Sequence, residues 1–121
     1  MVTPLPREEL LQQLVEYRLP IKPVVAALRE YSWDSDVPLF TVTREHIMTM
    51  LRRYLSGHLT AEQLTDWADL LECRDDITYE EQWYETLLQA IFELANPDIN
   101  APVSRELVQE IEQRFGDAPT I

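Results

Sequence analysis

The sequence predicts an all-α fold: a single compact domain over residues 1–121, built from about six helices with short connections. Three observations carry this prediction. One helix-start pattern occurs four times, apolar side chains recur with the helical period, and no segment alternates long enough to be a half-buried strand. With 121 residues and 45% apolar content, the chain is long enough for one core and too short for two.

The repeated pattern is an apolar residue, Ser or Thr, any residue, and Glu. The hydroxyl can accept a hydrogen bond from a backbone N–H at a helix start, and the dipole favours Glu in the first turn. The four segments are Val42–Glu45, Leu59–Glu62, Ile77–Glu80 and Val103–Glu106. Thr60 with Gln63, and Thr78 with Glu81, also have capping-box spacing. Each segment is therefore predicted to begin a helix.

Two further helices precede these four. The first is predicted from about Pro6 to Arg18, and a short second one begins near Pro23, because proline is favoured in a first turn. The one substantial loop follows, from Ser32 to Val42, and Leu39 to Val42 is interpreted as its extended end. Helix stops are expected at Gly57, Asn96-Pro97 and Gly116.

Apolar residues three and four positions apart mark the face that each helix should bury. The expected inner faces are Leu10, Leu11, Leu14 and Val15; Val24, Ala27, Leu28 and Tyr31; Ile47, Met50, Leu51 and Leu55; Leu64, Trp67, Ala68 and Leu71; Trp83, Leu87, Ala90, Ile91 and Leu94; and Leu107, Val108, Ile111 and Phe115.

The charge and cysteine content exclude several classes of function. A net charge of -12 with a single lysine, Lys22, argues against nucleic-acid binding, and the basic stretch from Arg44 to His58 is interpreted as a solvated face. No apolar run is long enough for a membrane span, and no signal peptide is recognised at the N-terminus. One cysteine, Cys73, allows no intramolecular disulfide. We therefore expect a cytoplasmic protein.

The strongest functional signal is a block of nine carboxylates and one arginine between Glu62 and Glu85. A field of one sign attracts basic partners. The alternative is a solvated face in which first-turn carboxylates match the helix dipole. That explains Glu80 and Glu81, but not Asp66, Asp69 and Glu72, which lie towards the C-terminal half of their helix. The predicted partner-binding residues are Glu62, Asp66, Asp69, Glu72, Asp75, Asp76, Tyr79, Glu80 and Trp33.

Tyr79 flanks the acidic block and would add contact area. Trp33 lies in the long loop beside Asp34 and Asp36, where an exposed aromatic could anchor an interface. The alternative is a loop side chain that packs on the core.

Catalytic, metal and cofactor sites are not predicted. Neither Asp34-Ser35-Asp36 nor Asp75-Asp76 has the alternating ligands, glycine and closing Glu of a calcium loop. The acidic neighbours of Cys73 should raise its pKa and blunt its reactivity. Two glycines cannot form a glycine-rich phosphate loop. We expect no enzymatic activity and no cofactor.

The stretch from Thr43 to about Ala95 resembles small acidic bacterial proteins of the colicin-like immunity type. The resemblance lies in the helix, glycine stop and capped restart of Leu51–Glu62, in Asp66-Trp67-Ala68, and in the acidic turn Glu72–Glu81. It implies a protein that neutralises a basic partner, such as a toxin domain, through an acidic helical face. The alternative function is a structural or regulatory helical subunit, either a homo-oligomer or an adaptor, with acidity that serves solubility.

Overall fold

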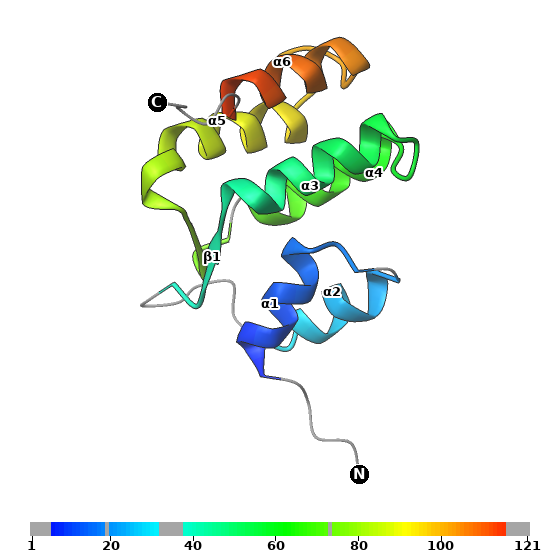
Figure 1. The fold of residues 1–121 in the computed structure, drawn as a ribbon. Coiled ribbons are helices and arrows are strands. Elements are labelled where there is room, and N and C mark those ends of the chain that lie inside the picture. The colour runs from blue at the N-terminus through cyan, green and yellow to red at the C-terminus, as the bar shows by residue number, and fades with distance from the viewer. Residues whose placement is uncertain (1–5, 19, 32–37, 73, 116–121) are drawn as a thin grey trace.

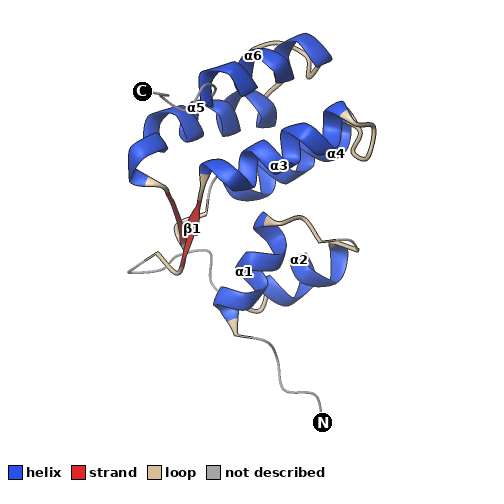
Figure 2. Cartoon of the chain, in the orientation of Figure 1, coloured by secondary structure: helices blue, strands red, loops and turns tan. Residues whose placement is uncertain are grey.

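The computed structural model describes residues 6–18, 20–31, 38–72 and 74–115 and confirms the predicted all-α class. Six helices dominate the described chain, and two short strands and one 3-10 turn join them (Figures 1 and 2). The elements are α1 (Arg7–Val15), α2 (Lys22–Leu28), β1 (Phe40–Val42), α3 (Arg44–Leu55), α4 (Ala61–Glu72), β2 (Ile77–Tyr79), η1 (Glu81–Trp83), α5 (Tyr84–Ala95) and α6 (Arg105–Phe115). No helix in these residues is long and apolar enough to cross a membrane.

The helices pack as pairs around one core. α1 packs on α2, α3 on α6, and α4 on α5. In Figure 1, α3 and α6 lie nearer the viewer, α4 and α5 lie behind them, and α1 with α2 forms a separate lower pair. The largest fully buried side chains come from every helix except α2 and include Leu11, Met50, Trp67, Leu94 and Phe115. The inner faces expected from the helical period are therefore largely confirmed.

Local capping explains where three of the helices begin. The Thr60 hydroxyl accepts from the Gln63 N–H at 3.0 Å, and Gln63 Oε1 accepts from the Thr60 N–H at 2.9 Å, which completes the predicted capping box. The Ser104 hydroxyl accepts from the Leu107 N–H at 3.2 Å. At the start of α3 the reciprocal partner of Thr43 is His46, whose Nδ1 accepts from the Thr43 N–H at 2.9 Å.

The His46 cap should make the stability of α3 depend on pH. Burial lowers the pKa of His46 below its ordinary value, although Glu16, Glu45 and Glu80 oppose this shift. A lowered folded-state pKa means that the unfolded chain takes up the proton first, so stability is full above about pH 6.5 and falls as the pH drops below it. Protonated Nδ1 cannot accept the Thr43 hydrogen bond, which costs about 1 kcal/mol.

His46→Gln should remove this dependence, because glutamine accepts at the same position without titrating. Urea unfolding at about pH 7.5 and about pH 5.5 measures the effect while the carboxylates remain ionised. The wild type should lose about 1 kcal/mol more than H46Q between the two values. Equal losses in the two proteins would rule out the cap as the titrating element.

The predicted helix start at Thr78 is wrong. Residues Ile77–Tyr79 form β2, which pairs in parallel with β1 in the register Phe40↔Ile77, Thr41↔Thr78, Val42↔Tyr79. Burial alternates along β2 (Ile77 and Tyr79 in, Thr78 partly out), as in a strand with one covered face. The α-helical segment begins six residues after Thr78, at Tyr84, after the η1 turn. Leu39–Val42, interpreted as an extended end of the loop, thus supplies the pairing strand.

The first helix is shorter than predicted, ending at Val15 rather than Arg18. Tyr17 has a φ of 50°, in the left-handed region that ends a helix. The Arg18 N–H reaches the Gln13 carbonyl at 3.1 Å and the Tyr17 N–H reaches the Leu14 carbonyl at 3.0 Å, so this turn satisfies carbonyls at the helix end. The side chain of Tyr17 is buried, which holds the turn in place.

Candidate functional site: an exposed acidic row on α4

Three of the predicted partner-binding carboxylates form an exposed row along α4. Glu62, Asp66 and Asp69 are four and three residues apart, which places them on one side of the helix, opposite buried Leu64, Trp67 and Leu71. We call Glu62, Asp66 and Asp69 the α4 acidic row. Among the described residues none of the three has an ion-pair partner within 4.0 Å, and α4 contains no Lys or Arg.

This arrangement opposes local stability. Like charges three or four residues apart on a helix each cost about 0.2–0.5 kcal/mol, and Asp69 lies towards the C-terminal end, where the dipole disfavours a carboxylate. The field of the row also reaches the end of α1: burial raises the pKa of Tyr17, and the charge of Asp66 raises it further. Glu62 is favoured by the dipole in the first turn of α4, whereas Asp66 and Asp69 have no such stabilisation, which is typical of a binding surface.

Two more predicted residues lie beyond the row. Asp75 is exposed in the turn after α4, so it can extend the negative surface. Glu72 is half-buried, and its Oε2 accepts from Asn96 Nδ2 at 2.8 Å, which joins the end of α4 to the end of α5. Glu72 therefore contributes charge at the edge of the surface while holding α5 in place.

Asp76 does not belong to an exposed surface. Its side chain is fully buried between Arg7 and Arg74, whose side chains are 14% and 6% exposed. Arg74 binds both carboxylate oxygens at 2.8 Å, and Arg7 Nε binds Oδ2 at 2.9 Å. Burial would raise the pKa of Asp76, but the hydrogen bonds and charges of the two arginines outweigh it and hold that pKa below its ordinary value. Asp76 is thus a structural anchor of α1.

Tyr79 and Glu80 also have structural roles in the described chain. Tyr79 is buried at 8% exposure on β2, with its ring edge-on to Tyr84 at 6.1 Å between centroids. Glu80 is half-buried, and its Oε1 accepts from the Arg44 N–H at 2.9 Å, capping α3 from a distant part of the chain. Their role in partner binding stays a prediction, with Tyr79 buried and Glu80 half-buried. Trp33, like Cys73, lies outside the described residues.

The sequence reasoning missed an apolar row on the exposed side of α5. Tyr84, Leu88 and Phe92 are 45%, 40% and 38% exposed and follow one another at four-residue spacing. We call these three residues the α5 apolar row. A signal was present: α5 is apolar over more of its circumference than one buried face requires, because Leu87, Ala90, Ile91 and Leu94 already fill the core side.

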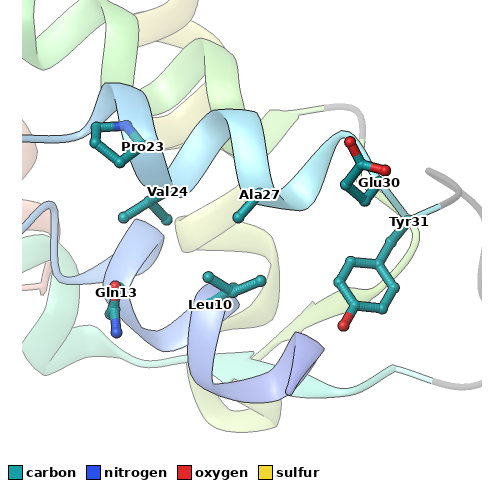
Figure 3. Close-up of a pocket in the computed structure, with 7 residues that line it drawn as sticks. All are labelled: Leu10, Gln13, Pro23, Val24, Ala27, Glu30 and Tyr31. Carbon is teal, nitrogen blue, oxygen red and sulfur yellow. The ribbon is translucent and has the colours of Figure 1, made fainter. Parts of the chain in front are cut away.

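A cavity of about 510 Å³ opens between α1 and α2 (Figure 3). Leu10, Val24 and Ala27 give it an apolar lining, and Gln13, Glu30 and Tyr31 supply the polar groups. Figure 3 shows Tyr31 beyond the end of α2, beside the start of α1, where its ring also meets the Arg7 guanidinium at 5.7 Å. This volume suits an apolar ligand or side chain.

No group of three or more potential metal-ligating side chains converges within residues 6–18, 20–31, 38–72 and 74–115. Comparisons with protein-family models, curated proteins and solved structures found no match to this chain. Within the part of the surface that the structure describes, the α4 acidic row and the α5 apolar row are the two features that indicate a function.

Proposed function

We propose that this protein is a small acidic protein-binding module of the immunity or antitoxin type, which neutralises a basic partner through the α4 acidic row. The supporting observation is that Glu62, Asp66 and Asp69 are exposed side by side without ion pairs among the described residues. Such a surface accelerates encounter with a cationic protein and makes binding sensitive to salt. We place this activity in the cytoplasm, consistent with a single cysteine.

Replacing Glu62, Asp66 and Asp69 together by lysine should weaken partner binding by at least about tenfold while the domain stays folded. Affinity capture from a lysate of the source organism, washed at low and high salt, would first identify the partner. The expected result is one basic protein that wild type retains at low salt and that the triple variant loses. Its affinity for both proteins would then be measured by calorimetry.

A matched control is Glu9→Lys, Glu30→Lys and Glu106→Lys, three exposed carboxylates outside α4 and α5. Each reversal adds two positive charges, so both triple variants change the net charge from -12 to -6. If only total charge matters, the two variants will weaken binding equally. That result, or unchanged affinity in the α4 variant, would contradict the proposed site.

The α5 apolar row favours a second candidate function, a helical subunit of an oligomer or larger complex. An exposed apolar patch commonly marks a protein–protein contact. Sedimentation separates the candidates: a homodimer whose stability does not depend on salt would support the subunit function, whereas a monomer that binds a basic protein only at low salt would support the immunity type.

A further inference from the structure

The α5 apolar row has the spacing of a helix-binding ridge. Single exposed apolar residues are ordinary on protein surfaces. Tyr84, Leu88 and Phe92, however, repeat every four residues, so they form a continuous ridge along roughly two turns of α5. The buried Tyr79 ring contacts Tyr84 edge-on and fixes one end of this ridge. A ridge of this kind is complementary to the groove between side-chain rows of another helix.

The surroundings of the ridge are acidic. Glu81 and Glu85 are exposed at its N-terminal end, and Asp98 is exposed beyond its C-terminal end, beside Ile99 at 70% exposure. No Lys or Arg occurs from residue 75 to residue 104. Arg114 on α6 is already bound to Glu93 at 2.6 Å. No lysine or arginine in this segment of the chain therefore balances the negative charges beside the ridge.

The ridge and the α4 acidic row belong to neighbouring helices. α4 and α5 pack against each other, and the Glu72–Asn96 hydrogen bond joins their C-terminal ends. Both helices lie behind α3 and α6 in Figure 1. The α5 apolar row and the α4 acidic row therefore lie on two helices that are in direct contact.

We propose that the occupant of the α5 apolar row is an amphipathic helix of a partner protein, with apolar side chains at four-residue spacing and Lys or Arg along its flanks. Its apolar side packs on Tyr84, Leu88 and Phe92, and its cations face Glu81, Glu85 and the α4 acidic row. A second copy of this chain is a poorer fit, since it would place the same acids opposite one another and bring a second net charge of -12. This inference rests on the proposed function, because it uses the same acidic row.

The test is fluorescence anisotropy with a labelled synthetic helix of leucine and lysine, in which the leucines lie on one face. A peptide of equal composition, with leucines distributed around the helix, and a leucine–glutamate peptide are the controls. Leu88→Ser with Phe92→Ser should weaken binding of the first peptide by about tenfold or more. Gln109→Ser with Gln113→Ser, at two exposed positions of α6, should leave it unchanged.

The possible outcomes separate the inference from the proposed function. We call Leu88→Ser with Phe92→Ser the α5 variant. Loss of binding in the α5 variant, together with a clear preference for the amphipathic lysine peptide over both control peptides, supports the inference. Equal binding by wild type and the α5 variant, or no binding by wild type, overturns it. If the lysine triple variant of α4 loses binding and the α5 variant does not, the inference fails while the proposed function stands.

If only the Leu88→Ser/Phe92→Ser variant loses binding and the α4 triple variant keeps it, the acidic row does not face the cations of the helix and the inference is overturned. The proposed function is then still decided separately, by the affinity of the captured basic protein for the α4 triple variant. Sedimentation of the wild type and of the Leu88→Ser/Phe92→Ser variant tests whether a second copy of this chain occupies the ridge. A concentration-dependent dimer that Leu88→Ser with Phe92→Ser converts to monomer would assign the ridge to a second copy and overturn the inference.

Discussion

Asp76→Asn should lower the free energy of unfolding by about 3–5 kcal/mol, the cost of removing one partner from a buried ion pair. The carboxylate is fully buried, and the Arg7 and Arg74 guanidiniums that bind it are almost buried as well. Asparagine would remove the buried negative charge that both guanidiniums bind, and it can accept with one oxygen only. Urea denaturation followed by circular dichroism measures the loss.

The neighbouring residue provides the control. Asp75→Asn makes the same chemical change at an exposed position and should alter stability by no more than about 0.5 kcal/mol. Because the pKa of Asp76 is lowered in the folded protein, its contribution is present above the unfolded value of about 3.9 and is lost as the pH falls through the folded-state value. Acid unfolding should consequently shift to higher pH in the Asp76 variant. Similar stability of the two variants would contradict the anchoring role of Asp76.

Trp67→Ala is the second change with a large expected effect, also about 3–5 kcal/mol. Trp67 is fully buried on α4, so alanine would leave a cavity the size of most of an indole. Its Nε1–H also donates to the Val15 carbonyl at 2.9 Å, linking α4 to the end of α1. Thermal and urea unfolding of the variant would give the loss in stability.

Trp67→Phe separates the hydrogen bond from the volume. Phenylalanine fills part of the space but leaves the Val15 carbonyl without its donor, which costs about 1–3 kcal/mol. Trp83→Phe is the comparison: Trp83 is only half-buried, packed against Phe115 at 5.6 Å between ring centroids. The Trp67 variant should be the less stable of the two, and the reverse order would show that the buried hydrogen bond has little weight.

The helices whose boundaries follow from neighbouring residues were predictable from sequence. Thr43, Thr60 and Ser104 cap helices as expected, and Gly57, with a φ of 87°, ends α3. The helix start predicted at Thr78 was wrong because of a tertiary contact. Its local pattern is that of a cap, but pairing with β1 requires a contact with residues far away in the chain, and that contact places Ile77 and Tyr79 in the core.

The site could be predicted only in part, because the exposure of a side chain also depends on contacts with distant parts of the chain. Asp66 and Asp76 belong to the same acidic block, yet Asp66 is exposed and Asp76 is buried, because Arg74, two residues away, and Arg7, 69 residues away, both bind Asp76. The α5 apolar row was missed because spacing alone does not say which of two apolar sides of a helix faces the core. Charge and periodicity therefore predicted the acidic block. Only the packing of the helices shows which of its carboxylates are exposed and which, like Asp76, are buried.

The parallel pairing of β1 with β2 has a consequence for how the chain folds. Phe40 and Ile77 are partners although 37 residues separate them, so joining the strands early would cost the entropy of closing a long loop. The α3–α4 hairpin lies between the strands and shortens this loop once it has formed. We therefore expect α3 and α4 to assemble first and β1 and β2 to pair later. Pairing of the two strands would then fix the N-terminal helices in place as a late step of folding.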